Sequence, residues 1–357
     1  MGFKTELNSS LSLRYFGQSS DISFPNTAPK STLNAHEPDC DYPVHSEEDY
    51  NWKPVPTVEN SADQSESPVV KEFYRTELGK MMQGNCLNYM SSSVPDASVD
   101  LIMTSPPFAL NRKKAYGNVA EADYCAWFKP FALEMHRILK DSGSLVLDIG
   151  GVWDKGQPTR SLYHFKLLIM LVEECGYYLA QEHYWHNPSK LPSPIEWVNK
   201  KRVRVKDSVN TVWWLSKSPH PKADNRRVLQ AYSASMKKQW KTGGAAGLRP
   251  SGHEMTDKFT DVGGSIPANL IVAPNSASSG QYFNYCKEAG LTPHPARFPE
   301  KLPEYFIKFL TTPGDLVLDP FAGSCTTGAV AEKLGRRWVC CDASEDYLRG
   351  AVGRFVS

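Results

Sequence analysis

The segment Thr104–Phe108, with the sequence Thr-Ser-Pro-Pro-Phe, combines groups that could hold a planar ring bearing an amino group. It follows the apolar run 99–103, which predicts a buried strand. Prolines lack an N–H, so the backbone beyond Ser105 cannot continue pairing in a sheet. A carbonyl, a hydroxyl and an aromatic face then meet where open α/β sheets bind ligands. That chemistry suits a flipped nucleobase, although such a string alone is usually only a turn.

A second segment near the other end of the chain predicts a nucleoside site. Residues 316–328, LVLDPFAGSCTTG, indicate a strand, a turn of small residues and a helix with Thr326 or Thr327 as its N-cap. The next strand, 337–342, ends in Asp342, a carboxylate that could accept hydrogen bonds from ribose hydroxyls. The segment lacks G-x-G-x-x-G, so no pyrophosphate cradle is expected. S-adenosylmethionine, a nucleoside cofactor without phosphates, fits better.

Together these segments resemble the amino-methyltransferases that act on exocyclic amines of DNA bases. The catalytic segment precedes the cofactor turn, which resembles the permuted "beta" order of that family. The Ser-Pro-Pro-Phe form resembles N4-cytosine enzymes, and Asn85 stands where the family usually has aspartate. The resemblance runs from about Phe73 to Tyr347. It includes Gly84-Asn85-Cys86 and the segments 105–110, 187–194, 249–253 and 294–299.

The resemblance implies a site-specific enzyme that methylates the N4 amine of cytosine in double-stranded DNA with S-adenosylmethionine. It further implies a modification partner of a type II restriction endonuclease, which shares the DNA site but makes no direct contact. The implied catalytic residues are Ser105, Pro106, Pro107 and Phe108. The implied cofactor residues are Asn85, Thr104, His294, Asp319, Pro320, Phe321, Ala322, Gly323, Ser324, Thr326 and Asp342.

The expected reaction is direct transfer to an amine whose lone pair is delocalised into the ring. Ser105 Oγ and the Pro106 carbonyl would accept both amino hydrogens and pull the nitrogen toward tetrahedral geometry. The freed lone pair would then attack the sulfonium methyl in line, with most of the rate coming from orientation and electrostatics. Phe108 would stack on the flipped ring, and Tyr184 and Trp185 could flank it.

Three other activities remain open at this stage. N6-adenine methylation is the nearest, because serine against aspartate at one position discriminates weakly. Methylation of RNA or a small molecule is the second, and an inert DNA-binding protein with the same fold is the third. The chain contains no Pro-Cys dipeptide, which speaks against 5-methylcytosine chemistry.

Alternating strands and helices predict a doubly wound α/β sheet, and the resemblance implies a mixed, circularly permuted methyltransferase sheet with an inserted target-recognition region. A hairpin and helix are expected within 71–93. Further strands are expected at 99–104, 144–148, 177–185 and 208–215. The helical run from Tyr124 to Ile138 is expected to pack as core and to restart at Pro130. A helix over 162–172 is expected to bury Leu162, Phe165, Ile169 and Val172.

Charge divides the chain into an acidic head and a basic body. Residues 1–70 hold 4 Lys and Arg against 11 Asp and Glu, and the remainder holds 36 against 28. We expect a disordered acidic extension at 1–70, a catalytic half at 71–216 and a cofactor-binding half at 291–357. Between these halves, the irregular basic segment 217–290 is the expected target-recognition region. The basic run 200–206 and the loop 111–117 are candidate DNA contacts.

Composition also bounds the location and the chemistry. No apolar run reaches the length of a membrane span. No secretory signal is expected, because no cationic start leads into an apolar core. The eight cysteines are scattered without a C-x-x-C pair, which favours reduced thiols in the cytoplasm. No metal site is expected, because His183 and His186 would point to opposite faces of a strand.

Overall fold

The computed structural model describes residues 70–109, 119–241, 247–248, 254–255, 263–275 and 280–356. The chain divides into two units, residues 1–57 and 58–357, and the described residues belong to the second. Three sequence expectations lie outside the described residues. These are the disorder of the acidic extension up to residue 69, the basic loop 111–117 and the segment 249–253.

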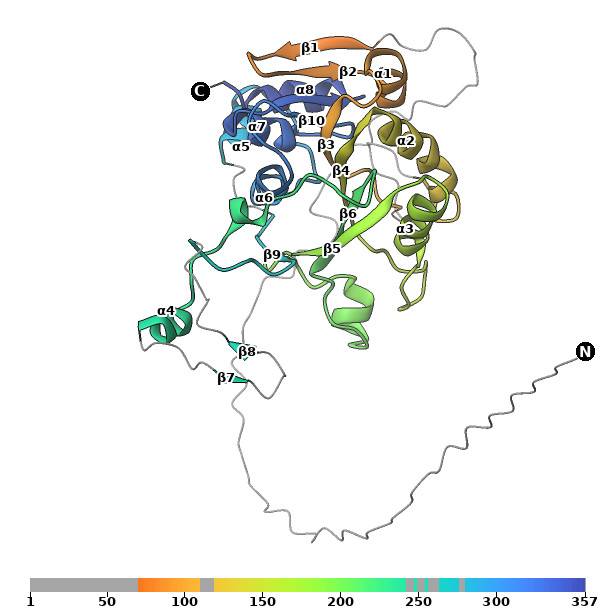
Figure 1. The fold of residues 1–357 in the computed structure, drawn as a ribbon. Coiled ribbons are helices and arrows are strands. Elements are labelled where there is room, and N and C mark those ends of the chain that lie inside the picture. Colours follow the sequence, from red (N-terminus) through yellow and green to blue (C-terminus); the bar gives the residue numbers. More distant parts are fainter. Residues whose placement is uncertain are drawn as a thin grey trace, which may run out of the picture. The chain divides into compact units, whose positions relative to one another are not determined.

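A nine-stranded mixed sheet forms the centre of the second unit, in the order β1-β2-β11-β10-β3-β4-β6-β5-β9 (Figure 1). Its strands are β1 (Lys71–Arg75), β2 (Gly79–Gln83), β3 (Val99–Thr104), β4 (Leu139–Ile149), β5 (Tyr178–His186), β6 (Val209–Ser216), β9 (Leu270–Val272), β10 (Leu316–Asp319) and β11 (Arg337–Asp342). A separate two-stranded sheet pairs β7 (Gly247–Leu248) with β8 (Glu254–Met255).

The α-helices are α1 (Cys86–Ser93), α2 (Tyr124–Ile138), α3 (Tyr163–Glu173), α4 (Ala234–Lys241), α5 (Gly280–Glu288), α6 (Lys301–Leu310), α7 (Thr326–Lys333) and α8 (Glu345–Val352). A short π-helix, η2 (Glu196–Lys200), and a 3-10 helix, η3 (Asn225–Val228), lie between β5 and α4.

The strand order brings the two predicted functional segments together. Strands β2, β11, β10, β3 and β4 run parallel, and β6 is antiparallel to both β4 and β5. In the β3–β10 pair, Leu101 lies opposite Val317 and Ile102 opposite Leu318. The carboxyl ends of these two strands therefore lie side by side, although more than 200 residues of chain separate them.

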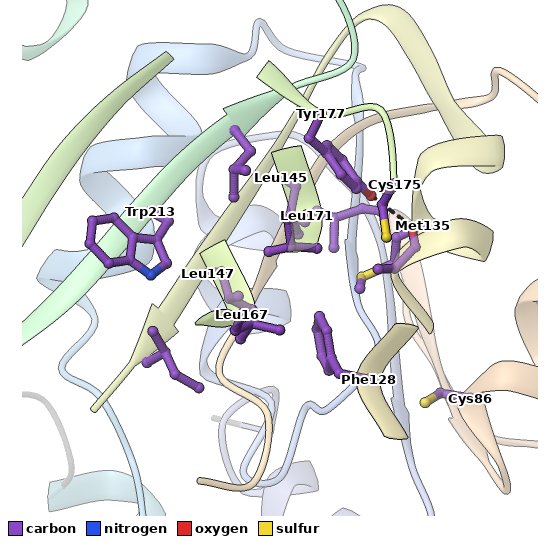
Figure 2. Close-up of a cluster of buried hydrophobic side chains, with 14 of the residues drawn as sticks. Cys86, Phe128, Met135, Leu145, Leu147, Leu167, Leu171, Cys175, Tyr177 and Trp213 are labelled. Atoms are coloured by element: carbon purple, nitrogen blue, oxygen red, sulfur yellow. Dashed lines mark hydrogen bonds between the residues drawn. The ribbon is translucent and has the colours of Figure 1, made fainter. Parts of the chain in front are cut away.

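Alternating side chains of the central strands feed two cores, one on each face of the sheet. Leu145 and Leu147 of β4 pack with Phe128 of α2 and Leu167 of α3 (Figure 2). Ile102 of β3 belongs to the same core. Leu101 of β3 and Val146 of β4 instead pack with α6, α7 and α8. The sheet is thus covered on both faces, which confirms the predicted doubly wound α/β architecture.

Two local expectations were wrong. Helix α2 runs through Pro130 without restarting, so the helical spacing of its apolar side chains prevails over the proline's missing N–H. The expected apolar face of α3 is exposed: Leu162 is 59%, Phe165 45%, Ile169 53% and Val172 37% accessible. The helix instead buries Tyr163, His164, Leu167, Met170 and Leu171.

Part of the segment 217–290 belongs to the central sheet. Strand β9 pairs with the edge strand β5 in parallel, with Trp185 opposite Ile271. In addition, the Asp224 N–H donates to the Phe309 carbonyl of α6 at 2.9 Å. The segment is therefore attached to the catalytic body at Asp224 and at residues 270–272.

Candidate functional site

A cavity of about 1490 Å³ opens at the carboxyl ends of β3 and β10. Ser105 and Gly323, from the two predicted segments, both line it. The lining includes all four expected catalytic residues, Ser105, Pro106, Pro107 and Phe108. From the expected cofactor set it includes Asn85, His294, Pro320, Phe321, Ala322, Gly323, Ser324, Thr326 and Asp342.

Ser105 belongs to a polar network that sequence reasoning missed. Its Oγ donates a hydrogen bond to Oδ2 of Asp148, at 3.2 Å, and Asn210 Nδ2 donates to Oδ1 of the same carboxylate, also at 3.2 Å. Burial raises the pKa of Asp148 to about 6, against the opposing effects of these hydrogen bonds and of Lys190. Because the Ser105 proton points to Asp148, the oxygen's lone pairs remain available to a substrate amine.

A tyrosine of α2 holds the catalytic segment Ser105–Phe108 in place. Tyr124 of α2 donates its hydroxyl proton to the Pro107 carbonyl at 2.8 Å. The Phe108 ring packs against Gly150, where an added Cβ would lie only 2.5 Å from the ring. The segment is therefore held in place before any substrate binds.

Thr104 and Asp319 do not line the cavity; they join the two strands beneath it. Thr104 Oγ1 donates to Asp319 Oδ1 at 2.7 Å, and Thr327 Oγ1 donates to Oδ2 at 2.6 Å. The Phe321 N–H also donates to Oδ1, at 3.2 Å. Burial raises the pKa of Asp319 to about 6, and these three hydrogen bonds oppose that rise. Their geometry favours a positioning role over direct cofactor contact.

The turn after β10 is closed by Asp342 at the end of β11. Its Oδ2 accepts the Gly323 N–H and its Oδ1 the Ser344 N–H, each at 2.8 Å. Gly323 has a φ of +50°, and an added Cβ would lie 3.1 Å from the His294 ring. This position therefore favours glycine in both conformation and space. The N-cap of α7 is Cys325 at φ 51°, so the expected threonine cap was wrong.

Asn85 has a local structural partner as well as a place in the cavity. It is the N-cap of α1, and its Oδ1 accepts the Leu87 N–H at 2.9 Å. The neighbouring Gly84 N–H donates to the Asp342 carbonyl at 3.0 Å. The amide nitrogen of Asn85 is therefore the group that could reach a ligand.

Aromatic side chains form one wall of the cavity. Trp127 and Phe131 of α2 line it and contact Phe321, with ring centroids 6.2 and 5.3 Å apart. Their expected assignment to core packing alone was therefore incomplete. Trp185 also lines the cavity, with its Nε1 donating to the Ala273 carbonyl at 2.9 Å. Tyr184, the other expected aromatic, is not part of the lining.

Three cations line the cavity although they were not among the expected site residues: Lys71, Lys190 and Arg297. Lys190 follows β5, and Arg297 precedes α6. The Nε of Arg297 is buried without a hydrogen-bond partner, and its guanidinium lies over the Phe283 ring, 4.4 Å from the centroid. Asp148 had a usable signal, since it is a carboxylate at the end of an apolar strand. Lys190 and Arg297 lie in the segments 187–194 and 294–299 of the family resemblance, which gave them no role. Asn210 had no such signal, because only the fold brings it to the cavity.

The described residues contain neither a metal-binding cluster nor a membrane-spanning helix. No group of three or more His, Cys, Asp or Glu side chains there could hold a metal ion. Likewise, no helix in the described ranges is both long and apolar enough to cross a membrane.

A doubly wound sheet with a polar, proline-stiffened strand end beside a small-residue turn defines the class of nucleoside-cofactor transferases. The sequence profile of the DNA methylase family matches residues 99–353, and the chain belongs to this family. It is 50% identical over 290 residues to the type II methyltransferase M.PvuII of Proteus hauseri, covering 80% of this chain and 86% of that protein. It is 29% identical over 297 residues to M.BglII of Bacillus subtilis, covering 82% and 72%.

A solved structure is similar over most of the chain. The structure titled PvuII DNA methyltransferase (cytosine-N4-specific) superposes with a TM-score of 0.65 at 46% identity, covering 79% of this chain and 88% of that one. The expected family resemblance is thereby confirmed.

Proposed function

We propose that this protein transfers the methyl group of S-adenosylmethionine to the exocyclic N4 amine of cytosine in double-stranded DNA. The observation that carries the proposal is the shared cavity: Ser105, bonded to Asp148, and the Gly323 turn, closed by Asp342, line the same space. Family membership and the similarity to a cytosine-N4-specific enzyme support the choice of reaction. The type II relatives support a role as the modification partner of a restriction endonuclease.

The residues present fit S-adenosylmethionine, which supplies an electrophilic methyl group when bound. Each carboxylate oxygen of Asp342 accepts one backbone N–H, so each keeps a lone pair for a ribose hydroxyl. The turn from Pro320 to Ser324 allows close approach of the backbone, with Thr326 and His294 beside it. Arg297, a cation in the wall with an unpartnered Nε, suits the cofactor's carboxylate.

On the substrate side, Ser105 Oγ and the Pro106 carbonyl accept the two amino hydrogens of the flipped cytosine. This orients the amine and favours the pyramidal geometry in which its lone pair can attack the methyl carbon. As the N–C bond forms, the methyl–sulfur bond would break and its electron pair would leave with the sulfur of S-adenosylhomocysteine. The positive charge is then on N4, whose surplus proton Ser105 can accept while its own proton passes to Asp148. A carboxylate with a pKa of about 6 is ionised at neutral pH and can take that proton.

Residues 217–290 are the proposed target-recognition region, and residues 200–206 contribute phosphate contacts. In this run the Lys200, Lys201 and Arg202 side chains are exposed. Glu196 pairs with Lys200 at 3.6 Å and with Lys201 at 3.7 Å, and Asp207 pairs with Arg204 at 3.1 Å. Arg202 is thus the first candidate for a phosphate contact, because the two lysines would have to exchange Glu196 for DNA. We expect the cognate endonuclease to share the DNA site without contacting this protein. The seven cysteines in the described ranges form no disulfide, which is compatible with action in the cytoplasm.

Nucleoside analysis of methylated DNA tests the proposal. Purified protein is incubated with S-adenosylmethionine and duplex DNA, and the digested nucleosides are separated by mass spectrometry. We expect N4-methylcytosine, and at least about 100-fold slower product formation by the Ser105→Ala variant. N6-methyladenine as the main product would support the adenine alternative, and cofactor binding without any methylated base would support an inert DNA-binding protein.

A further inference from the structure

Lys190 brings an ammonium group into the cavity that the proposed mechanism does not use. Its half-buried side chain lines the same cavity as Ser105 and Asp148. Within the described part of the chain, its Nζ has neither a hydrogen-bond partner nor an ion-pair partner. An ammonium group carries three donors, and withdrawing it from water without acceptors is unfavourable. The cavity therefore contains an unused donor group that a ligand could satisfy.

The acidic groups that influence Lys190 are already bonded to others. Burial lowers the pKa of Lys190, and the charges of Asp207 and Asp148 oppose that effect. Asp148 accepts from Ser105 and Asn210. Asp207 is paired with Arg160 at 2.8 Å and with Arg204 at 3.1 Å. Lys190 is consequently not the counter-ion of either carboxylate.

The loop that carries Lys190 is held against the sheet. The Ser189 N–H donates to Asn187 Oδ1 at 3.1 Å, and the Asn187 N–H donates to the Ser208 carbonyl at 2.8 Å. Lys206 Nζ donates to the backbone carbonyls of Pro188 and Lys190, at 3.4 and 3.3 Å. A charged donor on a fixed loop can discriminate between ligands, because it cannot move freely to follow a differently placed acceptor.

We propose that Lys190 is a specificity-determining residue that donates a hydrogen bond to the 2-carbonyl oxygen of the flipped cytosine. This inference rests on the proposed function. With the amine at Ser105, the same edge of cytosine presents its ring nitrogen and then its 2-carbonyl oxygen, both acceptors. Adenine carries a C–H group after the corresponding ring nitrogen, so only cytosine offers an acceptor at that place. The contact would favour cytosine over adenine. The segment Ser105–Phe108 discriminates weakly between these bases, because both carry the amine that it binds.

A cycle that changes the residue and the base separately tests this contact. The substrates are duplexes with either cytosine or a 2-aminopyridin-5-yl C-nucleoside at the target position. The analogue keeps the amine and the ring nitrogen and has C–H in place of the 2-carbonyl. Lys190→Met keeps the aliphatic volume and removes the charge. Lys166→Met, on an exposed position of α3, is the matched control for loss of one positive charge.

For Lys190→Met we expect kcat/KM on cytosine DNA to fall about 10- to 100-fold, as for loss of a charged hydrogen bond. The wild type should lose a similar additional factor on the analogue, whereas Lys190→Met should lose little further. Lys166→Met should behave as the wild type, and cofactor affinity should be unchanged in both variants.

Three results would overturn the assignment. The first is an equal penalty for the analogue in the wild type and in Lys190→Met, which would indicate no coupling to the 2-carbonyl. The second is an unchanged kcat/KM in Lys190→Met. The third is a DNA-binding salt slope reduced by about one, with no analogue coupling, which would indicate a phosphate contact. Failure of the proposed function would be seen separately, as a wild-type product other than N4-methylcytosine.

Discussion

Thr104 of β3 donates a 2.7 Å hydrogen bond to Asp319 of β10, and both side chains are fully buried. The bond joins the strand that ends in the catalytic segment to the strand that ends in the cofactor turn. Neither residue lines the cavity. Their contact therefore fixes the distance between the amine-holding and methyl-holding parts of the site.

Thr104→Val should weaken stability and activity together. It removes a buried hydrogen bond to a carboxylate, which costs about 1 to 3 kcal/mol of unfolding free energy. Because the two strand ends lose their link, kcat should fall and the cofactor Kd should rise by comparable factors. Urea unfolding, single-turnover kinetics and calorimetry measure the three quantities. A stable variant with only the cofactor Kd altered would contradict the positioning role and favour direct contact.

Ser105→Ala should separate catalysis from cofactor binding. The substitution removes the hydroxyl that accepts the amine and relays to Asp148, so turnover should drop roughly 100-fold or more. The cofactor turn lies on another strand, and the S-adenosylmethionine Kd should stay within about twofold, since no cofactor contact is lost. Rapid-quench methylation and calorimetry give the two values. Comparable loss of both would show that Ser105 acts on the fold rather than on the amine.

Asp342→Ala should have the opposite pattern. It removes the acceptor for ribose and also releases the Gly323 and Ser344 N–H groups. The cofactor Kd should rise by at least tenfold, whereas kcat at saturating cofactor should change much less. Calorimetry and turnover at high cofactor concentration make the comparison. Asp342→Asn retains one side-chain oxygen, so its cofactor Kd should lie between those of Asp342→Ala and the wild type.

Asp148 should set the acid side of the pH–rate profile. Its pKa is about 6, and its ionised form takes the proton, so the single-turnover rate should fall about tenfold per pH unit below 6. Above that pH the rate should level off. Asp148→Asn should be far slower and should lose this limb of the profile. An unchanged profile in Asp148→Asn would show that the carboxylate is not the proton acceptor.

The Asp148 carboxylate should also lower the free energy of unfolding at neutral pH. Its pKa in the folded protein, about 6, lies above the ordinary value of 3.8, so the folded state binds more protons between these values. Stability therefore decreases as the pH rises from about 4 to 6, by roughly 3 kcal/mol in total. Asp148→Asn should consequently melt at a higher temperature than the wild type at pH 8, with a smaller difference at pH 4. Thermal unfolding at both values tests this.

The sequence predicted the strands with their chemistry but not the side chains that meet across the fold. Strand 99–104 and the 316–342 unit were evident because their apolar runs and turns are local signals. Asn210 reaches the cavity only through tertiary structure, and no local pattern marks it. Lys190 and Arg297 lie in segments of the family resemblance, but only the fold shows that their side chains line the cavity. The exposed side of α3 was misjudged because apolar residues are spread around this helix. The helical period alone then cannot select the buried side.

Arg297 should select for the carboxylate of the cofactor. Its guanidinium lies over the Phe283 ring, which holds the cation in the wall of the cavity. Its Nε has no hydrogen-bond partner and can therefore donate to a ligand. Arg297→Met should raise the Kd for S-adenosylmethionine by about 10- to 100-fold. The Kd for decarboxylated S-adenosylmethionine should barely change, because that molecule has no carboxylate to lose. Arg349→Met, on an exposed position of α8, is the control. A similar loss for both ligands in Arg297→Met would mean that the arginine only supports the cavity wall.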